Sequence, residues 1–281
     1  MPPTEMPCDE MPWFPDFVGA VELVRRQTRA EGEVDPVGVY LDALNNGDLH
    51  ALRNSWPGEV VVYDPRAGEV RGHRRLRQFV HNNQVWLAER HARIERVAAT
   101  CVDGRAVVEL LAHLTDGGRE TAWPVAVVAE SPDDRSVVFR TYCSQLPVDR
   151  RPHVRPPILS PVDFQPGDVV GRHLAALRAG DTAAAVGTFT AAGYVREPVE
   201  ALLHRGPDEL RAYFDRCFSG GGVGVQPCAV TDDRARCALE YNWVSRGRHT
   251  VAPQAALAVY ERGPDGLLAA ARRYDDIEWR A

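Results

Sequence analysis

Asp35–Pro65 reads DPVGVYLDALNNGDLHALRNSWPGEVVVYDP, and Asp168–Pro198 reads DVVGRHLAALRAGDTAAAVGTFTAAGYVREP. The first residues of the two stretches stand 133 apart (168 − 35), and so do Asp64 and Glu197 near their ends (197 − 64). Self-similarity at one offset indicates an internal repeat, and a period of this length is that of a domain rather than of a solenoid unit. The sequence therefore predicts two versions of one fold.

Each copy predicts two helices followed by a strand. Asp35 followed by Pro36 is typical of a helix start, because the carboxylate accepts an orphan amide and proline needs no N–H in the first turn. Gly47 ends that helix, and Asp48 caps the next one. The β-rich run Glu59–Asp64 is then stopped by a proline. In both copies the last carboxylate therefore closes a strand, just before a turn.

The remainder of each half predicts one helix and four strands, separated by Asp-Gly and Gly-rich turns. They are expected at Arg74–Arg90, Ala92–Cys101, Arg105–Leu114, Ala122–Glu130 and Val137–Ser144, and at Pro207–Phe218, Gln226–Thr231, Arg236–Val244, Gln254–Glu261 and Leu268–Trp279. This order indicates an α+β fold, with three helices on one face of a curved, mostly antiparallel sheet in each half. The expected organisation is an N-terminal arm (1–32), a first domain (33–146), a semi-rigid Pro- and Arg-rich linker (147–166) and a second domain (167–281).

The composition predicts a soluble cytoplasmic protein. With 44% hydrophobic residues in 281, the chain can bury two ordinary cores. A net charge of −6 gives no reason to expect nucleic acid or an anionic membrane as a partner. No apolar run is long enough to span a membrane, and the N-terminus lacks the pattern of a secretion signal. The absence of lysine is typical of a G+C-rich, actinobacterial type of genome.

The sequence contains no motif for a cofactor. The six cysteines form no CxxC pair and show no metal-ligand spacing, so we expect buried, reduced thiols and no metal site. Nucleotide and flavin motifs are likewise missing. Any chemistry is then expected to come from acidic, basic and hydroxyl side chains alone.

The order of elements, with its Gly-Asp step and its strand ending in Asp-Pro or Glu-Pro, resembles the cone-shaped nuclear transport factor two fold. That superfamily includes ketosteroid isomerases and SnoaL-type polyketide cyclases. The spacing of Tyr40 and Asp64 resembles the isomerases, and the resemblance implies Tyr40 as oxyanion donor and Asp64 as general base. The departures are His173 at the tyrosine position of the second half, and Ala126 where the isomerases carry a second, acidic oxyanion group.

The tandem arrangement and the pairing of Asp64 with Glu197 are more similar to the polyether epoxide hydrolases, which open epoxides into cyclic ethers. The resemblance implies either carboxylate as the base and a carboxyl group on the first helix of a cone as the acid. Val37 and Val170 occupy that acid position here. Tyr40, His173 or another carboxyl group must therefore supply the proton.

Glu109 and Glu240 are the candidates for that other carboxyl group. They match across the repeat (240 − 109 = 131), and each points to the opposite side of its strand from its apolar neighbours. If that side is the inside of the cone, desolvation should raise the carboxyl pKa and make it a usable acid. The alternative is an outward-facing polar residue on a half-solvated strand.

Each candidate also has a structural interpretation. Asp64 and Glu197 can be turn-forming residues, although glutamate forms turns poorly. Tyr40 and His173 can be core residues of a helix. Four aromatic residues are expected either to line a substrate pocket or to pack in the core, namely Tyr142, Tyr274, Tyr241 and Trp243.

Taken together, the sequence predicts one apolar pocket in each half, with a carboxylate at its wall. The expected function is cofactor-independent acid–base chemistry on a hydrophobic, polyketide-like small molecule, with epoxide opening as the first choice. The alternatives are an isomerase or aldol-type cyclase, and a non-catalytic binding or scaffold protein. A homodimer is one expected assembly.

Overall fold

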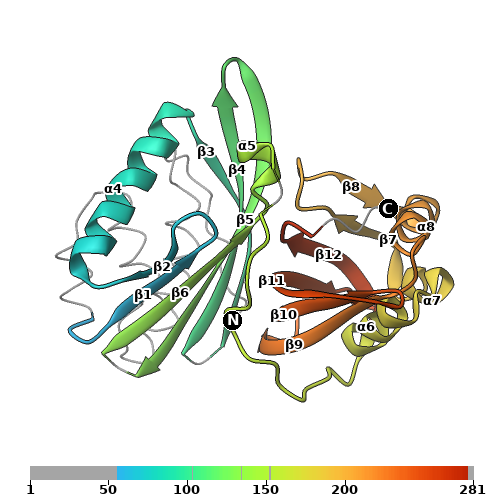
Figure 1. Cartoon of the computed structure of the whole chain (residues 1–281). Coiled ribbons are helices and arrows are strands. Elements are labelled where there is room, and N and C mark those ends of the chain that lie inside the picture. The colour runs from blue at the N-terminus through green and yellow to red at the C-terminus, as the bar shows by residue number, and fades with distance from the viewer. Residues whose placement is uncertain (1–55, 103, 134, 152, 278–281) are drawn as a thin grey trace, which may run out of the picture.

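Two six-stranded sheets form the centre of the molecule (Figure 1). The structure is a computed structural model that describes residues 56–102, 104–133, 135–151 and 153–277. The first half contains β1 Val60–Asp64, β2 Gly68–Arg71, α4 His73–Glu89, β3 Arg93–Val102, β4 Arg105–Asp116, β5 Arg119–Asp133, β6 Ser136–Cys143 and α5 Leu146–Asp149. The second contains α6 Val169–Ala179, α7 Thr182–Val186, β7 Phe189–Arg196, β8 Leu203–Arg205, α8 Gly206–Cys217, β9 Val223–Asp232, β10 Arg236–Arg246, β11 His249–Arg262 and β12 Leu268–Tyr274.

The two sheets have the same strand order. It is β2-β1-β6-β5-β4-β3 in the first sheet and β8-β7-β12-β11-β10-β9 in the second. Neighbouring strands are antiparallel, except that β1 pairs in parallel with β6 and β7 pairs in parallel with β12. The fold is therefore α+β with two mixed sheets. The expected arm, Tyr40, and the first two helices of the first half lie outside the described residues.

The repeated stretch forms the predicted elements in the second half. Asp168 caps α6 by accepting a hydrogen bond from the amide of Val170 (3.0 Å). Gly180 ends this helix at φ 68°, and a Cβ there would lie 2.8 Å from the backbone nitrogen of Gly222. Asp181 then caps α7 through the amide of Ala184 (2.9 Å). The cap interpretation of both aspartates is thereby confirmed.

The structure corrects the sequence prediction at three places. The short strands β2 and β8 were not predicted, since runs of three or four residues carry too little periodicity. The sequence predicts that the second helix of this half reaches Phe189, but Phe189 begins β7, where it pairs with Leu268 of β12. Strand β12 ends at Tyr274 rather than Trp279, because Asp275 accepts the amide of Ile277 (3.0 Å) in a turn.

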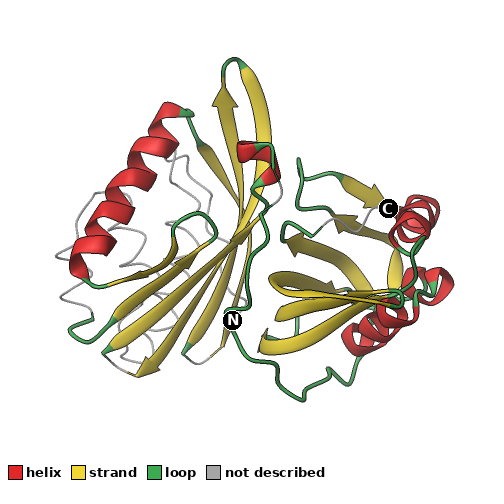
Figure 2. Cartoon of the chain, in the orientation of Figure 1, coloured by secondary structure: helices red, strands yellow, loops and turns green. Residues whose placement is uncertain are grey.

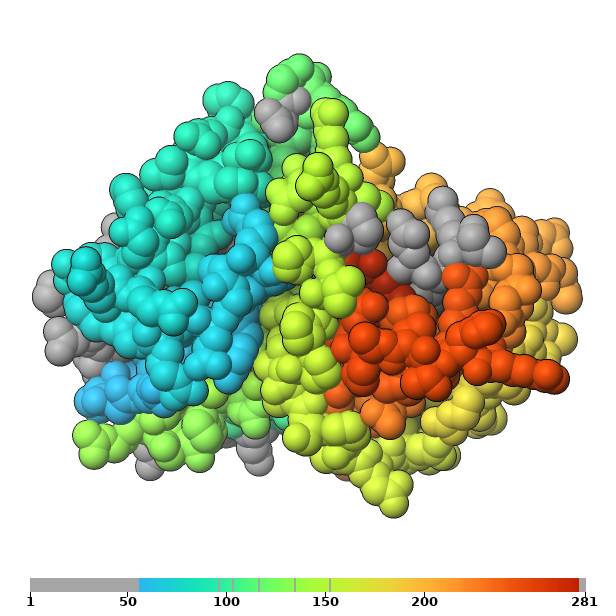
Figure 3. All heavy atoms as spheres, viewed as in Figure 1, coloured from blue at the N-terminus to red at the C-terminus, as the bar shows by residue number. Residues whose placement is uncertain are grey.

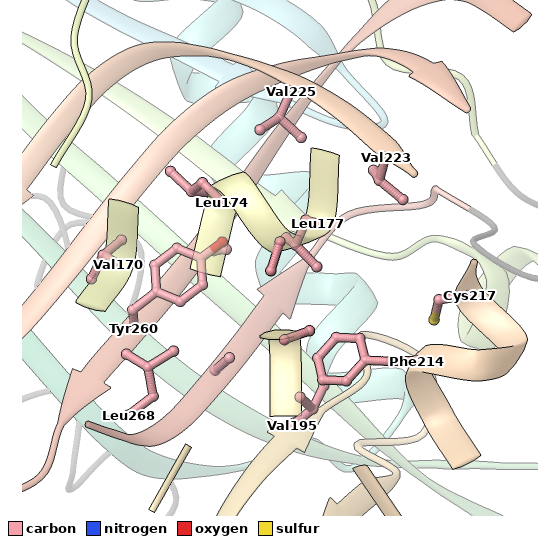
Figure 4. Close-up of a cluster of buried hydrophobic side chains, with 14 of the residues drawn as sticks. Val170, Leu174, Leu177, Val195, Phe214, Cys217, Val223, Val225, Tyr260 and Leu268 are labelled. Carbon is pink, nitrogen blue, oxygen red and sulfur yellow. The ribbon is translucent and has the colours of Figure 1, made fainter. Parts of the chain in front are cut away.

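Helices α4, α6, α7 and α8 lie on the outer flanks of the molecule, and the two sheets face each other between them (Figure 2). In the first half, Leu76, Phe79 and Val80 of α4 pack against Val108 and Leu110 of β4. The second half has a larger apolar core between α6, α8 and the sheet, in which Leu174, Phe214 and Tyr260 point toward one another (Figure 4). No helix in the described ranges is long and apolar enough to cross a membrane.

A third apolar cluster joins the two sheets. It contains Val107 and Val128 from the first sheet and Leu257 and Val259 from the second, with Ile158 packed against it. Burial of this seam excludes water from both sheet faces, so the halves form one continuous packed structure.

The Pro- and Arg-rich segment lies along this seam (Figure 3). Arg155 donates to the carbonyls of Thr141 and Tyr63 (3.0 Å to Tyr63) in the first half. Its own carbonyl accepts the amide of Ala255 (3.0 Å) in the second half. Because this one residue binds both sheets, the segment is held in a fixed position on the surface.

Candidate functional site

Glu109 and Glu240 lie between the two sheets. Glu109 accepts hydrogen bonds from Arg272 (2.7 Å to Nε, 3.0 Å to Nη2) and from the Tyr274 hydroxyl (2.6 Å). Glu240 has the matching partners, Arg140 (2.6 Å to Nε) and the Tyr142 hydroxyl (2.7 Å), and also binds Arg105. Each glutamate thus binds an arginine and a tyrosine of the other half.

This arrangement corrects the expectation that these carboxyl groups have a raised pKa. Burial alone would raise the pKa of Glu109, but Arg272 and Tyr274 outweigh it and hold the pKa below its ordinary value. The same balance, with Arg140 as the main opposing charge, lowers the pKa of Glu240. The polar side of each strand faces the other sheet instead of the interior of its own half, so both groups are buried, ionised partners of arginine.

The four aromatic candidates are all buried. Tyr142 and Tyr274 belong to the apolar seam between the sheets. Tyr241 and Trp243 belong to the core of the second half. Core packing, the alternative that the sequence left open, accounts for the position of all four.

The interior of the second half is filled by side chains. The cavity between α6, α8 and the sheet has a volume of only about 20 Å³, which is room for a single water molecule. His173, Tyr241 and Tyr260 are among the residues that line it. The apolar pocket expected inside this half is therefore closed.

His173 is a core residue. Its Nδ1 lies 2.9 Å from the hydroxyl of Thr188, and its ring makes edge contacts with Phe189, Phe214 and Tyr260 at centroid distances of 5.3–5.8 Å. Burial lowers its pKa from 6.5 to about 3. The imidazole is consequently neutral near pH 7, and its remaining N–H is too weak an acid to protonate an epoxide oxygen.

His173→Phe should reduce the loss of stability on acidification. Between pH 6.5 and about 3, this histidine binds a proton in the unfolded chain and not in the folded one, so stability falls as the pH falls. In His173→Phe, the slope of the unfolding free energy against pH should be smaller by up to about 1.4 kcal/mol per pH unit in this range. Urea unfolding at several pH values measures this, with the exposed His249→Phe as control. Equal slopes for wild type and His173→Phe contradict the assignment.

Asp64 ends β1 as expected and forms the turn that follows. Its Oδ1 accepts hydrogen bonds from the amides of Arg66 (2.9 Å) and Ala67 (2.8 Å). The side chain also lines a groove beside α4. Tyr40 lies outside the described residues, so its pairing with Asp64 remains a prediction.

Glu197 differs from Asp64 in its surroundings. Its side chain is buried, with 8% of the residue exposed, and Oε1 lies 2.6 Å from Nε2 of His204. The ring of His204 stacks on Tyr213 of α8 at a centroid distance of 4.7 Å. The following loop is closed by a hydrogen bond from the amide of Glu197 to the carbonyl of Leu202 (2.9 Å).

Two consecutive residues of this loop, Glu200 and Ala201, have φ values of 54° and 53°. Non-glycine residues rarely occupy this left-handed region, and such strain persists only where the surrounding structure enforces it. The conformation turns the chain back sharply after Glu197. It thereby brings His204 alongside a carboxylate only seven residues earlier.

Glu197 lines a cavity of about 390 Å³, a volume suited to a small organic ligand. Polar groups on its wall include Tyr213, Arg273 and Asp275, and apolar side chains include Leu146, Val199 and Leu202. Within the described residues, these groups form the strongest candidate site.

The polar wall is a connected network. Arg273 donates to Asp275 (2.7 Å from Nη2 to Oδ1) and to the hydroxyl oxygen of Tyr213 (3.2 Å from Nη1). Burial raises the pKa of Tyr213, with Arg273 opposing it, so the phenol keeps its proton at neutral pH. Burial likewise raises the pKa of Asp275 against the opposing effect of Arg273. The hydroxyl of Tyr213 accepts from a cation and can itself donate.

Part of the cavity wall comes from the first half. Asp276 accepts hydrogen bonds from the hydroxyl of Ser144 (2.5 Å) and the amides of Gln145 (2.8 Å) and His153 (3.1 Å). These bonds dock the end of β6 and the start of the linker onto the end of β12. They hold Leu146 at its place in the wall.

Sequence reasoning missed His204, Tyr213, Arg273 and Asp275. The repeat carried a signal for two of them, because the first half has Thr141 and Cys143 where the second has Arg273 and Asp275 (each 132 apart). A charged residue that is present in just one of the two copies indicates a place where the copies differ in function or packing. Nothing local marked His204, since its role depends on the left-handed loop. Within the described ranges, no group of three or more His, Cys, Asp or Glu side chains could hold a metal.

Comparisons with known proteins find similarity over part of the chain. Residues 37–139 match the SnoaL-like domain family. Similar solved structures include a putative polyketide cyclase from Sinorhizobium meliloti, with 20% identity over 39% of this chain and 99% of that one (TM-score 0.34). An epoxide hydrolase/cyclase-like enzyme of salinomycin pyran-ring formation has 20% identity over 38% and 86% (TM-score 0.33). A ketosteroid isomerase-like protein from Catenulispora acidiphila has 14% over 40% and 86% (TM-score 0.34). No curated protein sequence matches the chain.

Proposed function

We propose that this protein is an acid–base enzyme that opens an epoxide in a small oxygenated substrate within the cavity of the second half. The observation that carries the proposal is the short contact between Glu197 and His204 (2.6 Å) at the wall of a cavity large enough for such a ligand. The SnoaL-like match lies in the first half, at residues 37–139, and the second half repeats the strand order of the first, which supports a site of the same kind in the second half.

Glu197 is the proton acceptor in this proposal. Its carboxylate removes the proton from a hydroxyl group of the substrate, or from water, as that oxygen attacks an epoxide carbon. His204 lies behind it and is absent from the cavity wall, so it acts as a positioning residue that fixes the orientation of the carboxylate.

Tyr213 is the hydrogen-bond donor. As the carbon–oxygen bond of the epoxide breaks, negative charge develops on the departing oxygen, and the tyrosine hydroxyl stabilises it. Arg273 strengthens this donor by its own hydrogen bond to the phenol oxygen. The proton taken up by Glu197 then returns to the alkoxide, which leaves the enzyme unchanged.

Hydroxy-epoxides with apolar chains are the substrates that test the proposal, with cyclic ether or diol formation followed by chromatography. Tyr213→Phe should lower turnover by roughly 10²-fold, because it removes the donor and keeps the ring stacked on His204. Tyr194→Phe, which removes a hydroxyl outside the cavity, is the matched control. Equal rates for the two variants contradict the role of Tyr213, and no turnover of any hydroxy-epoxide by the folded wild type contradicts the proposed function.

A further inference from the structure

The first half has a groove of about 370 Å³ that shares no lining residue with the cavity of Glu197. It lies between the turn after β1 and the exposed side of α4. The described residues that line it are Asp64, Arg66, Ala67, Val70, Arg75, Gln78, Phe79, Asn82, Asn83 and Trp86. Guanidinium and amide groups thus line the groove together with the apolar side chains of Val70, Phe79 and Trp86.

The guanidinium of Arg66 is held in place from two directions. It lies 4.2 Å from the ring centroid of Trp86, and its Nη2 donates to Oδ1 of Asn83 (3.1 Å). Asn83 is fixed in turn, because its Nδ2 donates to the carbonyl of Phe79 (3.0 Å). Among the described residues, Nε and Nη1 of Arg66 take part in no hydrogen bond. The guanidinium is therefore a planar donor held in place, with two nitrogens that bind none of the described residues.

Among the described residues that line it, the groove carries more positive than negative charge, in a chain of net charge −6. Arg66 and Arg75 line it, and Asp64 is the only acidic side chain among its described lining residues. One oxygen of Asp64 is already bound by the amides of Arg66 and Ala67. A bound anion would therefore meet two guanidinium groups and one carboxylate oxygen. That oxygen is the second one of Asp64, which has no hydrogen-bond partner among the described residues.

We propose that this groove binds a small organic carboxylate with an aromatic or other apolar body. The carboxylate pairs with Arg66, assisted by Arg75, and the body lies against Val70, Phe79 and Trp86. The site involves no proton transfer and is independent of the reaction at Glu197. The protein thus has two sites of different chemistry, one in each half.

Isothermal titration calorimetry with 2-naphthoate on the full chain tests the proposal. Arg66→Gln should weaken binding about 10-fold or more, the usual loss for one charge-assisted hydrogen bond. Arg90→Gln is the matched control, because Arg90 also lies 4.2 Å from the ring centroid of Trp86 but does not line the groove. The control should bind naphthoate as the wild type does, and so should Glu197→Gln.

The wild type should bind the uncharged isostere 2-naphthamide at least 10-fold more weakly than it binds naphthoate. Arg66→Gln should bind the amide and the acid with equal affinity. The proposal is overturned if the amide binds as tightly as the acid, if Arg90→Gln weakens binding as much as Arg66→Gln, or if folded wild type shows no naphthoate binding at millimolar concentrations. Loss of naphthoate binding in Glu197→Gln alone also overturns it, because that result places the ligand in the other half.

Discussion

Glu197→Gln should lower turnover by roughly 10²- to 10⁴-fold, the usual contribution of a positioned general base. Glutamine keeps the length of the side chain and an oxygen that can accept the hydrogen bond of His204. The fold around the cavity should therefore persist while the proton acceptor is lost. The measurement is kcat and KM on the hydroxy-epoxide that the wild type converts best, with circular dichroism to confirm folding.

Asp64→Asn is the matched control for this variant, because Asp64 occupies the equivalent place in the first half. Asparagine retains an oxygen for the turn amides of Arg66 and Ala67, so folding should be preserved. We expect turnover near that of the wild type. If Asp64→Asn abolishes turnover and folded Glu197→Gln spares it, the reaction takes place in the first half and the assignment of Glu197 is wrong.

Glu240→Ala should destabilise the protein by about 3–5 kcal/mol, which is typical when one partner of a buried ion pair is removed. Arg140 and Tyr142 would lose their acceptor in the seam, where Arg140 is only 2% exposed. Arg140 would then keep only its bond to Glu130, and its buried Nε would have no acceptor. The shift in the midpoint of urea unfolding measures the effect.

Glu130→Ala is the control for that prediction. Glu130 also binds Arg140 (2.6 Å), but its side chain is 38% exposed, so its loss should cost no more than about 1 kcal/mol. Glu109→Ala, the counterpart of Glu240→Ala, should destabilise to a similar extent because its partners are equivalent. Equal shifts for Glu130→Ala and Glu240→Ala would falsify the view that the reciprocal pairs hold the sheets together.

The reciprocal pairs fix the position of one sheet against the other, which the apolar contacts of the seam alone would not do. Each glutamate can be satisfied only when the arginine and tyrosine of the other half reach it. A sliding of one sheet over the other would leave buried charges without partners, at a cost of several kcal/mol per ion. The arrangement of the halves therefore follows from the same residues that the sequence placed at matching positions of the repeat.

The sequence by itself predicted the matching order of the longer strands in the two halves and the helix caps of the second half. Asp168, Gly180 and Asp181 act through neighbours within a few residues, so their roles can be predicted locally. Strand alternation also predicted correctly that Glu109 lies on the opposite side from Val108 and Leu110.

Only the tertiary structure decided which side of each strand faces the interior of its own half. Both faces of these sheets are buried, one by helices and one by the other sheet, and alternation cannot distinguish two buried faces. The partners of Glu197 could not be predicted from the sequence for a related reason. Its contact with His204 depends on two left-handed residues in a loop, and its cavity is completed by Leu146 from the first half. Local signals fix local structure, whereas the pKa of a carboxyl group depends on the charges that folding brings to it from distant parts of the chain.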